Sequence, residues 1–155
     1  MLAVFTDGSA VESNPGPSGS AYIVMRKGKL LCGRGFSTGR GSNNRSELIA
    51  AVHGLKAALG FCAKGEDVLL VSDSTYLLQG LAKCSSCTRS GVPNHEQWRR
   101  LHGLLRLYAK NRSHCLLYWV RGHNGTNGNM LCDHMANKAA TDGLDYVPVQ
   151  KPRNA

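Results

Sequence analysis

Four acidic residues stand out because each lies where a strand or a helix of an α/β domain should begin or end. They are Asp7, Glu47, Asp73 and Asp133. The chain has 19 Lys and Arg against 10 Asp and Glu, which gives a formal net charge of +9. In so basic a protein a cluster of carboxylates needs strong compensation, which divalent metal ions provide. If the four side chains converge, they offer the chemistry of a metal-dependent nuclease.

The segments that must position these acids begin with three strands. Residues 2–7 form an apolar strand that ends at the first acid, and turn residues follow at 13–17. The apolar stretches 19–27 and 29–36 are separated by Gly28 alone, which is typical of a hairpin. We therefore expect the sheet to begin with antiparallel pairing.

Helices and buried strands alternate in the middle of the chain. Ser42 and the two asparagines after it offer N-caps for a helix that carries the second acid and repeats its apolar residues at helical spacing. Residues 67–72 predict a short buried strand of the parallel kind, which runs into Asp73. Asp73 is placed to cap a further helix, which we expect to extend through Leu81.

The last third of the chain predicts two more helices around one strand. A polar loop at 84–94 precedes a helix with Trp98 on its apolar face and several arginines elsewhere. Residues 114–120 are expected as another buried strand, and 129–141 as the final helix. Residues 142–155 contain two prolines and no periodicity, so we expect a frayed C-terminal tail.

This order, β-β-β-α-β-α-α-β-α, predicts one α/β domain over residues 1–141. Its five-stranded mixed sheet should be antiparallel over the first three strands, then parallel, and flanked by helices. Ligand sites in such sheets lie at the carboxyl ends of the strands. If strands one and four are neighbours, Asp7 and Asp73 meet there.

Composition and charge favour a nucleic-acid partner. No apolar run approaches the ~20 residues of a membrane span, and the start lacks the features of a signal peptide, so we expect a cytoplasmic protein. From Lys83 to Arg112 there are seven basic residues and one acid, Glu96, which favours a phosphate-facing surface. Without a secretory signal, the cysteines are expected as reduced thiols. Cys84 and Cys87 have C-x-x-C spacing but lack the further ligands of a zinc site, so we expect a thiol pair without a metal.

Several short blocks resemble type 1 ribonuclease H, in that family's order and approximate spacing. They are residues 5–9 with 14–17, then 43–48, 72–76, 119–125 and 129–136. One block such as Thr-Asp-Gly-Ser is weak evidence for a family by itself, whereas five blocks in register are strong evidence. The resemblance implies an RNase H-like fold and an endonuclease that hydrolyses the RNA strand of RNA–DNA hybrids, leaving 5′-phosphate and 3′-hydroxyl ends.

The resemblance also implies a role for each acid. Two Mg²⁺ ions, for which Mn²⁺ can substitute, would be bridged by Asp7, with Asp73 and Glu47 on either side and Asp133 completing the second site. Mg²⁺ prefers oxygen ligands and keeps several waters, so four carboxylates shared by two ions is a sensible number. His123, in a glycine-rich loop, would move protons or help product leave.

Substrate contacts are implied as well. The amides of three asparagines can read 2′-hydroxyls across a minor groove, and a serine with a nearby arginine can hold a DNA phosphate. A threonine stands where the family often has a glutamine that reads the RNA strand. The helix with Trp98 and several arginines, here called the basic helix, would compensate for a short segment at residues 83–91. The expected contacts are Asn14, Arg40, Ser42, Asn43, Asn44, Thr75, Arg99 and Arg100.

Other interpretations stay open at this point. Asp73 alone could be a helix cap, and Asp133 alone an exposed residue in the first turn of its helix. The same architecture also serves nucleases that cut DNA, and a noncatalytic hybrid-binding module is a further alternative. The intact set of four acids favours catalysis, and we expect the protein to act as a monomer.

Overall fold

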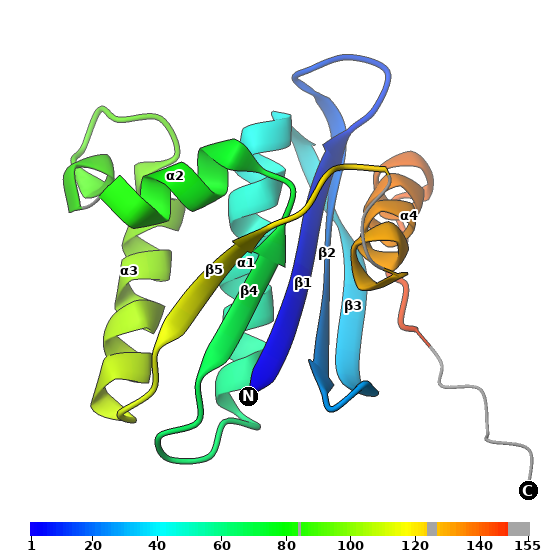
Figure 1. Ribbon diagram of the computed structural model, residues 1–155. Helices are drawn as coiled ribbons and strands as arrows, with labels where there is room; N and C mark the ends of the chain where they lie inside the picture. Colours follow the sequence, from blue (N-terminus) through cyan, green and yellow to red (C-terminus); the bar gives the residue numbers. More distant parts are fainter. Residues whose placement is uncertain (84, 124–126, 149–155) are drawn as a thin grey trace, which may run out of the picture.

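In the computed structural model, the described residues are 1–83, 85–123 and 127–148, and their elements follow the predicted order (Figure 1). The strands are β1 (Leu2–Ala10), β2 (Gly16–Arg26), β3 (Lys29–Gly41), β4 (Val68–Ser72) and β5 (Cys115–Trp119). The helices are α1 (Asn43–Leu59), α2 (Thr75–Lys83), α3 (His95–Lys110) and α4 (Asn127–Asp142), with a short 3₁₀ turn at Ser85–Thr88. None of the helices in these ranges has the length and hydrophobicity of a membrane span.

The sheet has the expected five strands, in the order β3-β2-β1-β4-β5. β1 pairs antiparallel with β2, and β2 pairs antiparallel with β3. β1 pairs parallel with β4, and β4 pairs parallel with β5. The first and fourth strands are therefore neighbours, which meets the condition set for Asp7 and Asp73 to lie together, and their carboxyl ends share one edge of the sheet.

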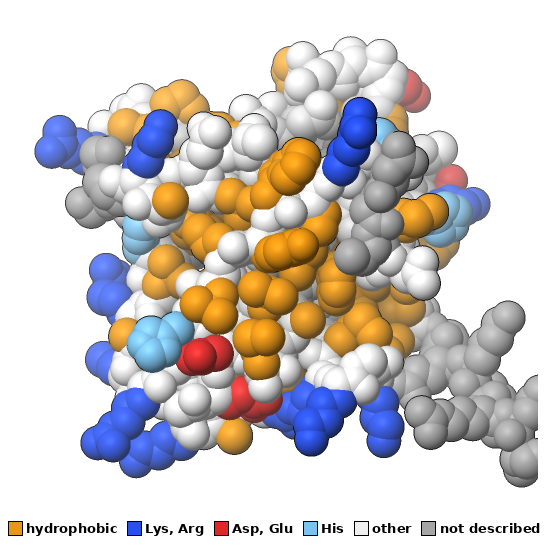
Figure 2. All heavy atoms as spheres, viewed as in Figure 1, with side chains coloured by type: hydrophobic (Ala, Val, Ile, Leu, Met, Phe, Trp, Pro, Cys, Tyr) orange, Lys and Arg blue, Asp and Glu red, His pale blue; other side chains and the backbone are white. Residues whose placement is uncertain are grey.

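Helices cover both faces of the sheet, which gives three layers (Figure 1). The main core lies between the sheet and α1, α2 and α3, where Trp98 and Tyr108 are almost fully buried. On the opposite face α4 packs Cys132 and Met135 against Ile23 of β2. Hydrophobic side chains also gather on the exposed surface in the view of Figure 2.

The structure corrects two predictions made for the end of the chain. The segment 114–120 was expected as a buried strand, yet Leu116 is 45% exposed and Tyr118 is 55% exposed. β5 is an edge strand with only β4 beside it, so its apolar residues did not indicate burial. The tail is not frayed throughout, because Tyr146 exchanges two backbone hydrogen bonds with Gly35 of β3.

Ser42 and Ser74, rather than Asp73, provide the N-caps of α1 and α2. Ser42 Oγ accepts a hydrogen bond from the Arg45 backbone N–H at 3.1 Å, as predicted for the start of α1. At the start of α2, Ser74 Oγ accepts from the Leu77 N–H at 3.1 Å. Asp73 therefore does not cap α2, since Ser74 already fills that role, and its carboxylate is left for other contacts.

α1 approaches the sheet most closely at Gly54. A Cβ atom built there would lie 2.8 Å from Val4 Cγ1 and 3.0 Å from Tyr22 Cβ. Gly103, in the middle of α3, is a matched contrast, because its Cβ would meet only the end of the Arg106 side chain at 4.0 Å. The close approach of α1 thus depends on the missing side chain at Gly54.

We expect Gly54→Ala to lower the free energy of unfolding by about 1–2 kcal/mol, because overpacking at the sheet outweighs the better helix propensity of alanine. Gly103→Ala should raise it by roughly 0.5–1 kcal/mol, because only the propensity changes. Urea unfolding of both variants measures the difference. Equal stabilisation by the two substitutions would contradict the tight packing of α1.

Candidate active site

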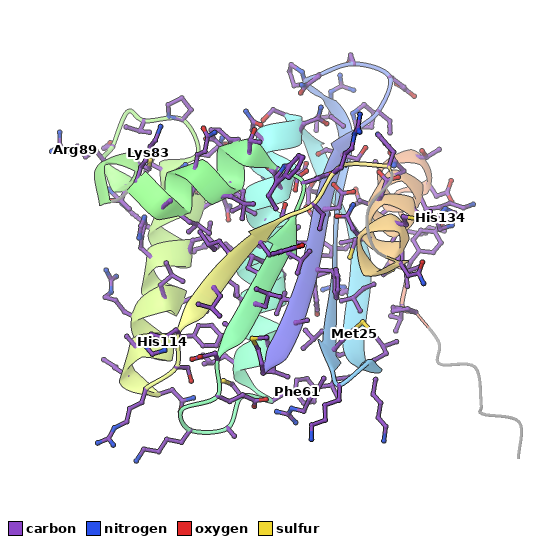
Figure 3. All side chains as sticks on the ribbon, in the orientation of Figure 1. Met25, Phe61, Lys83, Arg89, His114 and His134 are labelled. Atoms are coloured by element: carbon purple, nitrogen blue, oxygen red, sulfur yellow. The ribbon has the colours of Figure 1, made fainter. Side chains whose placement is uncertain are left out.

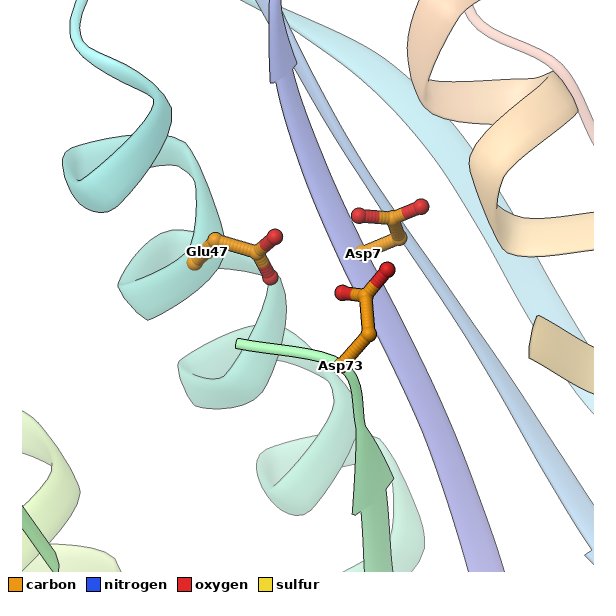
Figure 4. A group of neighbouring side chains, drawn as sticks. All are labelled: Asp7, Glu47 and Asp73. Carbon is orange, nitrogen blue, oxygen red and sulfur yellow. The ribbon is translucent and has the colours of Figure 1, made fainter. Parts of the chain in front are cut away.

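Three of the predicted acids form a tight cluster at the edge where β1 and β4 end. One carboxylate oxygen each from Asp7, Glu47 and Asp73 lies within 4.8 Å of the others. Figure 4 shows the three side chains pointing toward one another from β1, α1 and the end of β4. The parallel β1–β4 pairing accounts for Asp7 and Asp73, and the packing of α1 brings in Glu47.

Gly8 makes the approach of β1 to α1 possible. A Cβ atom at this position would lie 2.3 Å from the backbone nitrogen of Glu47 and 2.3 Å from the backbone carbon of Ser46. No side chain can be accommodated there without moving α1. The Asp-Gly pair of the first sequence block is therefore explained by packing: the acid supplies the charge, and the glycine lets the helix with Glu47 come close.

Burial and mutual repulsion raise the pKa values of all three carboxyl groups. Burial, followed by the charge of Asp73, raises the pKa of Asp7 to about 8, against the opposing hydrogen bond from the Gly8 N–H at 2.8 Å. Burial, followed by the charge of Asp7, raises the pKa of Glu47 well above its usual value. Burial also raises the pKa of Asp73, with a further contribution from Asp133. A cation at the cluster would relieve all three shifts.

Asp133 lies beside this cluster rather than within it. It lines the same cavity of about 280 Å³ as the other three acids, together with Asn43 and His123. Its Oδ2 lies 3.7 Å from Nδ1 of His123, whose side chain is 84% exposed. The structure thus brings the four predicted acids and the predicted histidine to one cavity.

One predicted substrate residue, Asn43, lines the same cavity, and a second, Asn14, is hydrogen-bonded to it. Asn43 Oδ1 accepts from the Ala10 N–H at 2.5 Å, and Asn14 Oδ1 accepts from the Asn43 N–H at 3.0 Å. Both carbonyl oxygens are therefore used within the protein. The side-chain NH₂ groups of both residues remain as donors facing no partner among the described residues.

A second cavity, of about 590 Å³, lies between the start of α1, α2 and the start of α3. It contains Ser42 and Asn44, as the sequence predicted for substrate contacts, together with Asn94 and Lys83. Figure 3 shows Lys83, which lines this cavity, and Arg89 at one corner of the molecule. Polar side chains at the N-cap and start of α1, on α2 and at the N-cap of α3 thus contribute to the lining of this second cavity.

The remaining predicted contacts are more dispersed. Arg40 lies near the end of β3, opposite Pro17, and Thr75 is exposed at the first position of α2. Arg99 donates through Nε to the Thr88 carbonyl at 2.9 Å. Arg100 lines a different groove, between α1 and α3, so the structure does not bring it to either cavity.

The other described histidines lie away from the acids or have structural partners. Figure 3 places His114 at the beginning of β5, at the opposite end of the sheet, and His134 on the outer side of α4. His114 pairs with Asp67, and the His53 ring lies against Phe36 with centroids 4.6 Å apart. Cys84, half of the C-x-x-C pair, lies outside the described residues.

Sequence reasoning missed several polar residues at these cavities, among them Ser9, Asn94 and Asn137. Asn137 and Ser9 line the acid cavity, and Asn94 lines the second one. Asn137 was detectable in principle, because it follows Asp133 by four residues on a predicted helix. Asn94 gave no signal, because its place at the second cavity depends on how the preceding loop folds.

Comparisons with known proteins agree with this arrangement. The RNase H family model matches residues 1–141. A ribonuclease H from Neorickettsia sennetsu is 32% identical, over 94% of this chain and 96% of the relative. A ribonuclease H from Pseudomonas fluorescens is 34% identical, over 94% of this chain and 95% of the relative.

Solved structures support the fold. The N-terminal RNase H domain of a Mycobacterium tuberculosis protein has a TM-score of 0.73 at 22% identity, and covers 92% of this chain and 94% of its own. LC11-RNase H1, solved in complex with an RNA/DNA hybrid, has a TM-score of 0.72 at 20% identity, over 92% of this chain and 98% of its own. With the family match over nearly the whole described chain, the protein belongs to the RNase H family.

Proposed function

We propose that this protein is an endonuclease that hydrolyses the RNA strand of RNA–DNA hybrids with two Mg²⁺ ions. One observation carries the proposal: three carboxylates lie within 4.8 Å of one another in a chain that belongs to the RNase H family. Residues 1–141 would form the catalytic domain. The monomeric state and the cytoplasmic location expected from the sequence stay predictions.

The residues at the cluster fit divalent metal ions. Glu47 Oε2 is buried and has no hydrogen-bond partner among the described residues, so a buried acceptor faces the cluster unsatisfied. The donor set consists of carboxylate oxygens, which suits Mg²⁺ and Mn²⁺ better than softer metals. Asp7, Glu47 and Asp73 would hold one ion, and Asp7 with Asp133 a second.

When bound, two Mg²⁺ ions supply charge neutralisation at the phosphate and a more acidic water. The chain's own groups would do the rest. The NH₂ groups of Asn14 and Asn43 would donate to 2′-hydroxyls of the RNA strand. Ser42 with Arg40 would hold a phosphate of the DNA strand, and Thr75 would face the RNA. His123, exposed and next to Asp133, would move a proton during product release.

The basic helix is proposed to act differently from the other contacts. Arg100 lines the groove between α1 and α3 with Lys56 and Arg106, whereas Asn43 lines the acid cavity. Arg99 and Arg100 would therefore contribute to long-range attraction of the hybrid rather than to contacts at the scissile phosphate.

The first prediction concerns cleavage itself. Asp7→Asn and Asp73→Asn should each lower kcat on a labelled RNA–DNA hybrid with Mg²⁺ by at least about a hundredfold, because each removes charge that the metal ions need. Glu96→Gln, which alters an exposed acid on α3, is the control and should keep wild-type activity.

Substrate choice separates this proposal from its alternatives. Duplex DNA and single-stranded RNA, assayed beside the hybrid, should be cut far more slowly. Preferential cutting of duplex DNA would support a related DNA nuclease. Tight binding of hybrid without any cleavage would support a binding module. Undiminished cleavage by Asp7→Asn would contradict the metal assignment.

A second prediction separates near contacts from distant charge. Asn43→Ala should raise KM for the hybrid by roughly tenfold, because a direct hydrogen bond to the substrate is lost. Arg100→Ala should change KM by less than about threefold at moderate salt, and that small effect should vanish as salt rises. Steady-state kinetics at two salt concentrations measure both. Equal losses for the two variants would contradict the separate roles.

A third prediction follows from the raised pKa values. In the unfolded chain Asp7 ionises near the ordinary aspartate pKa of 3.8, whereas in the folded, metal-free protein its pKa is about 8. Between these values the unfolded state binds fewer protons than the folded state. The free energy of unfolding in EDTA should therefore fall as pH rises from 4 to 8.

Asp7→Asn should weaken this pH dependence and raise the metal-free stability at pH 8, by on the order of 2 kcal/mol. Added Mg²⁺ should stabilise the wild-type protein at pH 8 and the variant much less. Thermal or urea unfolding with EDTA or Mg²⁺ provides the measurement. A variant less stable than wild type in EDTA would mean that the carboxylates do not repel one another.

A further inference from the structure

Asp133 is less enclosed by the fold than Asp7 or Glu47. Its side chain is 32% exposed, whereas Asp7 and Glu47 are buried. It also comes from α4, on the opposite face of the sheet from the helix that carries Glu47. Packing alone therefore does not fix the direction of its carboxylate, and a specific contact must do so.

That contact comes from Asn137, one turn further along α4. The Asn137 side-chain nitrogen donates to Asp133 Oδ1 at 3.0 Å and to the Asp133 backbone carbonyl at 2.9 Å. The other carboxylate oxygen, Oδ2, is the one that lies nearest His123. One oxygen of Asp133 is thus restrained by the helix, and the other is left toward the cavity.

The orientation of the Asn137 amide follows from its partners. An ionised carboxylate only accepts hydrogen bonds, so the amide nitrogen must face Asp133 and the amide oxygen must face away. That oxygen accepts a hydrogen bond from Ser9 Oγ at 2.6 Å. Ser9 lies on β1, two residues after Asp7. A continuous chain of hydrogen bonds therefore joins the acid of α4 to the strand that carries the first acid.

We propose that Asn137 is a positioning residue: anchored by Ser9, it holds Asp133 toward the other three acids and so raises the affinity of the site for divalent metal ions. The inference rests on the proposed function of that site. A neutral amide suits this task, because a lysine or arginine would cancel the charge of Asp133 and an acid could not donate to it. Hydrogen-bonding partners of metal ligands typically change metal affinity by roughly 10- to 100-fold.

The test measures Mn²⁺ binding to the purified protein by the electron paramagnetic resonance signal of the free ion. Asn137→Ala should weaken binding by about tenfold. Lys138→Ala, which changes the adjacent exposed residue, should bind as the wild type does. In hybrid cleavage, the Mg²⁺ concentration for half-maximal rate should rise with Asn137→Ala, while the rate at saturating Mg²⁺ recovers most of its wild-type value.

Asn137→Asp distinguishes positioning from simple electrostatics. An added negative charge near a cation site strengthens binding if charge alone matters. If Asn137 positions Asp133, the same substitution weakens binding, because the new carboxylate repels Asp133 and donates no hydrogen bond. Tighter Mn²⁺ binding by this variant would overturn the proposal, and so would wild-type binding by Asn137→Ala.

Ser9→Ala keeps the test open if the Asn137 variants fail to fold. It removes the anchor and leaves the amide, so Mn²⁺ binding should weaken in the same direction by a smaller factor. Wild-type binding by Ser9→Ala would then overturn the proposed anchor. A wild-type protein that neither binds Mn²⁺ nor cuts hybrid would instead overturn the proposed function. If the wild-type protein cuts hybrid and the Ser9 and Asn137 variants bind Mn²⁺ as tightly as it does, only this inference is overturned.

Discussion

Repulsion between buried carboxylates is the constraint on which the rest of this structure depends. Asp7 and Glu47 are almost inaccessible to solvent. The charge of Asp73 raises the pKa of Asp7, and the charge of Asp7 raises the pKa of Glu47. Such an arrangement destabilises the metal-free fold near neutral pH, because burial disfavours the charged forms and proximity adds to the cost. The scaffold must therefore supply stability elsewhere, and the well-packed core around Trp98 and Tyr108 is suited to that. The same repulsion becomes attraction for a divalent cation.

The architecture meets this constraint by drawing each acid from a different element. β1 and β4 bring two acids to one edge through parallel pairing, and α1 adds the third because Gly8 permits close approach. α4 supplies Asp133 from the other face, with Asn137 and Ser9 connecting it to β1. Because the four carboxylates come from different elements, their mutual repulsion develops only when the tertiary structure brings them to one cavity. At that stage of folding, the packing of the core can offset the repulsion.

Much of this was predictable from the sequence, and the failures have physical causes. Asp7 and Asp73 were placed from strand ends and topology, which depend on local hydrophobic patterns and on a general rule for α/β sheets. The exposure of β5 was not predictable, because an edge strand and a central one can share the same apolar composition. Asp73 was mistaken for a possible cap, since Ser74 beside it is an equally good one. The substrate contacts expected of Arg99 and Arg100 stay predictions, because a basic helix in the sequence does not indicate which groove each side chain faces. Asn137 escaped notice because its significance depends on Ser9, 128 residues away.

The most direct measurement is anomalous diffraction from crystals of the wild-type protein soaked in Mn²⁺. The account predicts an anomalous peak between Asp7, Glu47 and Asp73, with metal–oxygen distances of about 2.0–2.3 Å. At higher Mn²⁺ concentration a second peak should appear on the side of Asp133. No peak at the cluster, at Mn²⁺ concentrations that support cleavage of the hybrid, would contradict the claim that these four acids form the metal site.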